Sequence, residues 1–474
     1  MVDDKFKYLI KGLKDVFNID EINKIAKESK FMQRKSCIKP EDFLIFNTLH
    51  GEDLCKTPLS QLASRYDAIF DKQVSKQAID KRFNNFSVDF MMTIFNKIMY
   101  IQNNILKNLE TTLNLHFERV IINDSTGFAL PKEYADKFPG AGGSGSSSAI
   151  KIQLQYELLT GSFMKMDIFP GTKADATYLE SMEKENKKND LKLADLGYLK
   201  IDYLKKLQKS GASFISKVKS NTALYIKNKK PERYKTGGIK KSSRYIKLDI
   251  LELSKPLIEG ETIELKDVYV GSKKEFRSRL IVTKLTEENK NKREIAHKEN
   301  IRKKCQVFKQ GRMDFNSVNA YISNVSDKIL DSTQIHELYT LRWQIEIMFK
   351  IWKSIFKINE VKKVKIERFK CFLYGRLIAL LLSSSIVFTA KNIILEEINQ
   401  EISEIKSFGS IFQYLPKLAS VIFKTETHLL QFFKKVFLNF KRFCLKSSKN
   451  NKKIPIDILK IIKLDLLKIE KIAS

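Results

Sequence analysis

The chain has 474 residues, and its 86 Lys and Arg against 55 Asp and Glu give a net charge of +31. A surplus of this size, spread along the whole chain, favours a polyanionic partner such as nucleic acid. The five cysteines are scattered and form no Cys-x2-Cys pair, which argues against a disulfide framework or a zinc site and fits a reducing cytoplasm.

The N-terminal residues 1–112 are predicted to be helical. Within them, residues 57–66 and 74–83 form two short helical patterns joined by a turn, and Ser75 is a good N-cap for the second. This arrangement is similar to a helix-turn-helix, in which the second helix lies against DNA. The alternative is an ordinary helical hairpin with a solvated polar face. The residues expected near DNA are Ser75, Lys76, Gln77, Lys81 and Arg82.

From about residue 113 the pattern becomes that of strands. Residues 117–124 form a β-branched run that we expect to end at Asp124, followed by a turn at 125–127. Residues 150–156 and 163–169 are predicted to return as two further strands. The glycine- and serine-rich segment 138–148 lacks Gly-Lys-Ser/Thr, so it is predicted to be a surface loop rather than a phosphate-binding loop.

A second aspartate follows the next predicted strand. A polar, helix-prone segment at 174–189 precedes the strand 191–194, which ends at Asp195, and a helix at 201–210 leads to a strand at 212–219. The order predicts a mixed sheet with helices on its faces, and carboxylates at strand ends lie at the mouth of such a sheet. Other aspartates compete with Asp195 for a functional role, namely Asp167, Asp175, Asp190 and Asp202.

Residues 221–318 are predicted to form a basic, β-rich insertion. Strands are expected at 246–251, 267–270 and 279–283 in an antiparallel sheet, with a charged helical or mobile stretch at 287–302. One more strand, 320–325, leads into the next helix. The most apolar run, 377–390, is short for a bilayer span and is interrupted by serines, so we interpret it as part of a buried core helix at 367–396. Residues 400–474 are predicted to be helical and basic.

A helix predicted from a cap at Ser332 or Thr333 to about Phe356 carries a polar stripe. At 100° per residue, Tyr339, Arg342, Glu346 and Lys353 lie within about 60° of one another. The stripe is either a solvated face with i,i+4 pairing or a functional face. The separate apolar face, expected to dock on a core, comprises Leu338, Leu341, Ile345, Met348, Phe349, Trp352 and Phe356.

If the sheet brings the strand ends together and this helix packs across them, Asp124, Asp195 and Glu346 converge. Oxygen ligands without His or Cys suit Mg²⁺ or Mn²⁺. Two such ions, about 3.5–4 Å apart, activate a water or a 3′-hydroxyl for phosphodiester displacement.

The motifs Asn123-Asp124-Ser-Thr, Leu193-Ala-Asp195-Leu-Gly-Tyr198 and Tyr339-x2-Arg342-x3-Glu346-x6-Lys353 resemble those of the DDE transposases of insertion-sequence family four. The resemblance covers nearly the whole chain. It implies an α/β ribonuclease H-like core in two parts, 113–220 and 319–398, interrupted by the insertion 221–318. This core is flanked by a helical DNA-binding domain at 1–112 and a helical basic region at 399–474.

The resemblance also implies roles for single residues and partners. Asp124, Asp195 and Glu346 bind the two metal ions, while Tyr339, Arg342 and Lys353 contact DNA phosphates. The partners are the inverted-repeat ends and target DNA, bridged by a homodimer in the bacterial cytoplasm at the nucleoid. The chain lacks a Trp in its insertion, and Phe308, Phe315 and Tyr321 remain candidates for stacking on a flipped base. The alternative functions are a ribonuclease H-like nuclease without strand transfer and a non-catalytic DNA-binding relic.

Overall fold

The computed structural model describes residues 2–107, 116–142, 145–198, 200–303, 313–446 and 454–462. Cys305 and Phe308 lie outside these residues. The chain divides into two compact units. We call them the helical unit (Met1–Thr112, Ser125–Lys173 and Gln344–Lys452) and the sheet unit (Leu113–Asp124, Ala174–Trp343 and Lys453–Ser474).

The helical unit begins with the predicted helices. They are α1 (Val2–Val16), α2 (Ile19–Glu28), α3 (Pro40–Thr48), α4 (Leu59–Phe70), α5 (Lys76–Arg82) and α6 (Asn85–Lys107). The two short helices expected in the helix-turn-helix segment are confirmed as α4 and α5. The Ser75 side chain caps α5 by accepting a hydrogen bond from the Ala78 amide, as predicted.

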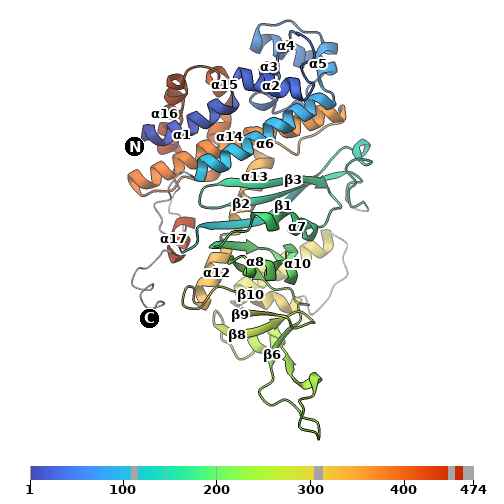
Figure 1. The fold of residues 1–474 in the computed structure, drawn as a ribbon, viewed down its shortest axis with the longest axis vertical. Helices are drawn as coiled ribbons and strands as arrows, with labels where there is room; N and C mark the ends of the chain where they lie inside the picture. The colour runs from blue at the N-terminus through green and yellow to red at the C-terminus, as the bar shows by residue number, and fades with distance from the viewer. Residues whose placement is uncertain are drawn as a thin grey trace. The chain divides into compact units, whose positions relative to one another are not determined.

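The core of the helical unit is α14 (Ile366–Ile398), which packs against α6, α3, α15 (Glu404–Val421) and α1 (Figure 1). The predicted apolar run 377–390 lies within this helix of 33 residues, which by length and composition alone could cross a membrane. Its apolar window is 94% buried inside the protein, which confirms the predicted core helix. The helical unit also contains α16 (Glu426–Phe443) and the antiparallel strands β2 (Ala149–Glu157) and β3 (Ser162–Pro170).

The sheet unit is built on a mixed sheet whose strands follow the order β1-β4-β5-β10-β9-β8-β6-β7. The strands β1 (Arg119–Ala129), β4 (Asp190–Ala194) and β5 (Ser213–Lys217) are parallel neighbours. The antiparallel part comprises β10 (Val318–Ser323), β9 (Phe276–Lys284), β8 (Thr262–Val270), β6 (Leu224–Lys227) and β7 (Tyr245–Lys247). Helices α7 (Leu179–Met182), α8 (Ile201–Lys209), α9 (Ile250–Ser254), α10 (Glu287–Lys303), α12 (Ser332–Thr340) and α17 (Pro455–Leu459) belong to this unit.

Several expectations are corrected here. The first strand does not end at Asp124, because residues 125–127 continue β1 instead of forming a turn. Residues 174–189 form only one four-residue helix flanked by 3₁₀ turns, and residues 250–254 form α9 rather than a strand. The antiparallel strands predicted at 267–270 and 279–283 are confirmed, whereas the one predicted at 246–251 is a strand only to Lys247. Strand β9 pairs directly with β10, so these strands continue the same sheet.

The helix with the polar stripe is two helices, α12 and α13 (Trp343–Ser354), separated at Leu341 and Arg342. The cap is Asp331, whose carboxylate accepts hydrogen bonds from the amides of Thr333 and Gln334, and not Ser332 or Thr333 as we predicted. The side chain of Gln334 returns to the Asp331 amide and completes a capping box. All seven residues of the predicted apolar face are buried.

Candidate active site

Asp124 and Asp195 lie side by side in the sheet unit. The parallel pairing of β1 with β4 aligns Asn123 with Ala194, so one further residue aligns Asp124 with Asp195. Aligned residues on neighbouring strands point to the same face, and the strands are about 4.8 Å apart. The two predicted carboxylates therefore share one face of the sheet, at the end of β4.

The same transverse row continues across two more strands. The pairing of β4 with β5 aligns Ala194 with Ser216, which places Lys217 beside Asp195. Tyr321 of β10 is the direct partner of Lys217. Four strands thus present Asp124, Asp195, Lys217 and Tyr321 in one line, which we call the polar row.

The end of α12 supplies two groups to this row. The Arg342 guanidinium lies 3.2 Å from the Asp124 carboxylate, and both side chains are largely buried. The Tyr339 hydroxyl donates to an Asp195 oxygen at 3.5 Å, and its ring packs 4.9 Å from the ring of Tyr321. The interruption between α12 and α13 falls at Arg342, so the arginine follows the end of the first helix rather than standing on a continuous helical face.

Burial and charge shift several pKa values around the row. Burial, with the nearby Asp195 carboxylate, raises the pKa of Tyr339 far above its usual range, so the phenol stays a hydrogen-bond donor. Burial lowers the pKa of Lys217 to about 8, assisted by Arg293 and opposed by Asp195. Burial also lowers the pKa of His336, whose Nδ1 lies 2.8 Å from the Tyr321 hydroxyl.

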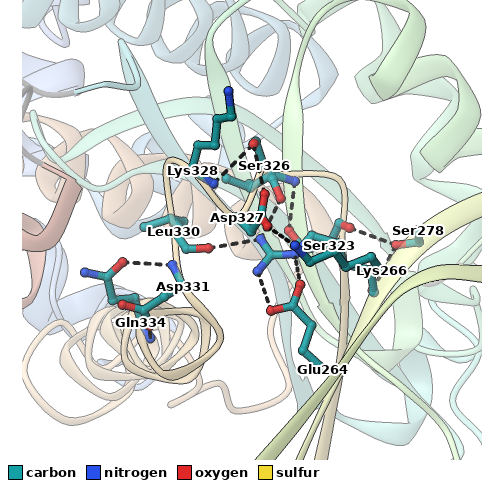
Figure 2. Close-up of polar contacts among 12 residues, drawn as sticks. Glu264, Lys266, Ser278, Ser323, Ser326, Asp327, Lys328, Leu330, Asp331 and Gln334 are labelled. Atoms are coloured by element: carbon teal, nitrogen blue, oxygen red, sulfur yellow. Dashed lines mark hydrogen bonds and ion pairs between the residues drawn. The ribbon is translucent and has the colours of Figure 1, made fainter. Parts of the chain in front are cut away.

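A polar cluster fixes the loop that enters α12 (Figure 2). The buried Arg279 of β9 donates to the backbone carbonyls of Val325 and Leu330 at 2.6 and 3.0 Å. Its guanidinium also pairs with Glu264 of β8 at 2.8 Å. The antiparallel strands therefore hold the segment between β10 and α12, and with it the start of the helix that carries Tyr339.

Glu346 and Lys353 both belong to α13 in the helical unit, seven residues apart and so on one face about two turns apart. Glu346 is half-buried. The Lys353 ammonium donates to the Gly127 carbonyl of β1 at 2.9 Å, and burial lowers its pKa.

The aspartate pair fits a hard divalent ion, because it offers carboxylate oxygens and no His or Cys. Within the described part of the chain, no three His, Cys, Asp or Glu side chains cluster closely enough to hold a metal ion. The sheet unit thus assembles two of the three expected ligands.

The competing aspartates have other positions. Asp190 is fully buried and forms an ion pair with Arg119 at 2.6 Å, which ties the starts of β4 and β1 together. Asp202 is exposed at the start of α8. Asp167 lies within β3, and Asp175 lies in a 3₁₀ turn.

The predicted DNA-contacting residues of α5 divide into two groups. Lys76, Gln77 and Lys81 are exposed, together with the capping residue Ser75. Arg82 instead donates to the carbonyls of Phe31 and Ile38 at 3.1 and 2.7 Å, and its guanidinium lies over the Phe31 ring. The fold therefore uses the Arg82 side chain to join α5 to the segment after α2.

Sequence reasoning missed Lys217, Arg293 and His336. The signal for Lys217 was available, because it stands at the end of a strand as Asp195 does. Arg293 and His336 come from a charged helix and from α12, and hydrogen bonds to residues of β10 bring them near the row.

Comparisons with known proteins give the family to which the chain belongs. The model of the family described as "Transposase DDE domain" matches residues 115–382. The transposase for insertion sequence element IS1151 of Clostridium perfringens is 63% identical over 472 residues, which is 100% of both chains. The transposase for element IS231F of Bacillus thuringiensis subsp. israelensis is 33% identical over 471 residues, covering 97% of this chain and 96% of that one.

Among solved structures, a piggyBac transposase in a synaptic complex with hairpin DNA aligns with a TM-score of 0.43 at 12% identity. The alignment covers 94% of this chain and 87% of that one. The family model and the full-length relatives establish the kinship. The chain belongs to the DDE-domain transposases of insertion sequences, metal-dependent enzymes that cleave DNA and transfer its strands.

Proposed function

We propose that Asp124, Asp195 and Glu346 are the carboxylate triad of this transposase. The observation that carries the proposal is the pairing of Asn123 with Ala194 on adjacent parallel strands, after which Asp124 and Asp195 are the next residues. Glu346 follows on α13, the helix that begins directly after Arg342. The expected ions are two Mg²⁺, or Mn²⁺, which supply an activated water or 3′-hydroxyl and stabilise the leaving oxygen when bound.

Tyr339, Arg342 and Lys353 hold the DNA backbone beside this triad. Arg342 is suited to grip a phosphate through two N–H groups, and its distance of 3.2 Å from the Asp124 carboxylate supports a contact with the phosphate beside the triad. Tyr339 remains protonated because of its raised pKa and can donate to a phosphate oxygen. Lys353 adds a point charge from α13.

The spacing of these residues supports assignment of the chain to insertion-sequence family four, with a ribonuclease H-like core. The parallel order β1-β4-β5 is the arrangement that such a core requires of its two aspartates. The five-domain division made from the sequence remains a prediction.

We further propose that α4 and α5 contact the inverted-repeat ends of the element. The exposed Lys76, Gln77 and Lys81, with Ser75 at the helix start, form the contacting edge. The enzyme would act as a homodimer on two DNA ends in the bacterial cytoplasm, at the nucleoid, with residues 400–474 as the contact region.

The triad is tested by Asp124→Ala, Asp195→Ala and Glu346→Ala in a cleavage assay on DNA carrying the element ends. Each variant should still bind DNA and lose Mg²⁺-dependent cleavage. Asp202→Ala is the matched control, since it removes an exposed carboxylate from the same unit and should cleave normally. Cleavage by any triad variant at the wild-type rate would contradict that assignment.

Strand transfer is tested separately with pre-cleaved ends and a supercoiled target. Joined product that requires both the divalent ion and Asp195 supports the full transposition reaction at this site. Cleavage without any joined product would assign a hydrolytic nuclease activity to the triad instead.

A further inference from the structure

A basic pocket opens beside the polar row in the sheet unit. Its volume is about 510 Å³, and its wall comes from the end of β5 and the following turn, from α10, and from the residues before β10. The lining residues that matter for charge are Lys217, Lys219, Arg293 and His297, and none of the described lining residues is Asp or Glu. A lining of this positive charge favours the binding of an anion in the pocket.

The cations of this pocket have different tasks. Arg293 is fixed by hydrogen bonds to the Val318 carbonyl at 3.1 Å and the Asn319 side-chain oxygen at 2.6 Å, which are neutral acceptors that leave its charge in place. Lys219 is exposed at the rim. Within the described part of the chain, the half-buried Lys217 ammonium makes no hydrogen bond or ion pair.

Lys217 connects the pocket to the aspartates. It is aligned with Asp195 on the neighbouring strand, so the two backbones are about 4.8 Å apart, and β1 with Asp124 lies one strand further. Holding a half-buried ammonium beside Arg293 is unfavourable, as its pKa of about 8 indicates. An anion in the pocket would offset that cost.

We propose that Lys217 binds a phosphodiester of the DNA strand, next to the phosphodiester that reacts at Asp124 and Asp195. Arg293 lies behind Lys217, and Lys219 lies at the rim. This proposal rests on the proposed function of the triad. Phe315 also lines the pocket and adds a half-exposed aromatic ring on which a base of the bound DNA strand can stack. The pocket thus extends the active site along the sheet towards the insertion.

The test is the affinity of Lys217→Gln for a short fluorescent DNA duplex, measured without divalent ions over a range of salt concentrations. We expect affinity to fall about five- to tenfold at low salt and the slope of log affinity against log salt to become shallower by about 0.9, the value for one lost phosphate contact. Lys217→Arg should restore most of the affinity and the slope. The variant should fold, because it removes a half-buried charge, and a thermal melt checks this.

Lys205→Gln is the matched control, because Lys205 is in the same unit and is already paired with Glu275 at 2.6 Å. It should leave affinity and slope unchanged. If Lys217→Gln binds like the wild type, or if Lys205→Gln weakens binding equally, the pocket is not a phosphate site. Binding is measured without metal, so it is independent of the Mg²⁺-dependent cleavage assay. If the wild-type chain binds DNA but does not cleave it in the cleavage assay, the proposed triad is contradicted and the proposed phosphate site in the pocket is not.

Discussion

Arg82 is a basic residue whose charge serves the fold. Its guanidinium is half-buried against the Phe31 ring and donates to two backbone carbonyls, and burial lowers its pKa. Lys81, the preceding residue, is exposed and makes no such contact with the segment after α2 among the described residues. Adjacent cations of one predicted DNA-contacting edge therefore have different consequences on removal.

We predict that Arg82→Ala lowers the free energy of unfolding by about 2 kcal/mol, because it leaves two carbonyls without their donor. Lys81→Ala should leave stability within about 0.5 kcal/mol and weaken DNA binding instead. Urea unfolding and DNA affinity, measured on both variants, separate the two effects. Equal stability of the two variants would show that the Arg82 contacts contribute nothing.

Arg342 lies both beside a proposed metal ligand and at the break between two helices. It lies 3.2 Å from the Asp124 carboxylate and follows directly on the end of α12. We predict that Arg342→Ala reduces cleavage of element ends about 100-fold, as expected for loss of a charged group beside the reacting phosphate. Arg342→Lys should recover only part of this, because an ammonium cannot make the bidentate contact.

The control for Arg342 is Arg277→Ala, which removes an exposed arginine paired with Asp267 in the same unit. It should cleave at the wild-type rate. A thermal melt of Arg342→Ala close to that of the wild type is needed for the interpretation, and cleavage unchanged in this variant would remove Arg342 from the active site.

At the scale of single elements, the start of α12 sets the position of Tyr339. Asp331 caps the helix and forms a capping box with Gln334 (Figure 2). Arg279 holds the preceding loop through the Leu330 carbonyl. We predict that Asp331→Ala costs about 1 kcal/mol of stability, the usual value for a lost N-cap, and lowers cleavage more than DNA binding. Asp331→Asn keeps a capping acceptor and should behave nearly as the wild type in both assays.

The buried ion cluster that joins α14 to α15 gives a second prediction for an element. Lys391 pairs with Glu404 at 2.7 Å, and Lys446 pairs with Glu401 at 2.8 Å. Burial alone would raise the pKa of Glu404, but the ammonium groups of Lys391 and Lys446 outweigh it and lower the pKa to about 2. Because the pKa of Glu404 is lower in the folded chain than its value of 4.5 in the unfolded chain, the ionised carboxylate stabilises the fold at pH values above 4.5. This contribution is lost as pH falls from 4.5 towards 2.

We therefore predict that Glu404→Gln lowers the free energy of unfolding by about 3 kcal/mol at neutral pH, because Lys391 stays buried with a weaker partner set. The difference from the wild type should shrink as pH falls below 4.5. Urea unfolding of both proteins across this range is the measurement, and a difference that stays constant with pH would contradict the assigned pKa.

The elements themselves show what the sequence could predict. Short apolar or alternating runs bounded by turns located β2, β3, β4, β5 and β10. Apolar spacing located the buried face of α12 and α13, because helix burial follows this spacing. The break at Leu341 and Arg342 was not visible, because neither Pro nor Gly marks it. Strand β1 continues to Ala129, beyond its pairing with β4, which ends at Asn123. The other hydrogen-bonded neighbour of β1 is β2, and strand pairing overrides the local turn signal at 125–127.

At the scale of the whole molecule, the active site depends on contacts far apart in sequence. Periodicity placed Asp124 and Asp195 at strand ends, but only the register of β1 with β4 aligns them, and that register is set by pairing that no local pattern encodes. Lys217 and Tyr321 were missed or left open for the same reason, since they reach the polar row through two further pairings.

The net charge of +31 is distributed over both units, and this allows a test of how the molecule uses it. Lys76 and Lys81 are exposed cations of the helical unit, and Lys217 and Lys219 line the pocket of the sheet unit. If both units contact one DNA molecule, each lysine that binds a phosphate should contribute about 0.9 to the slope of log affinity against log salt.

We predict that the double variant Lys76→Gln with Lys81→Gln and the double variant Lys217→Gln with Lys219→Gln each reduce this slope. The quadruple variant should show the sum of the two losses. The measurement is fluorescence anisotropy on DNA carrying one element end. A quadruple variant whose slope equals that of one double variant would show that only one unit binds that DNA. The excess positive charge of the other unit would then need a different explanation.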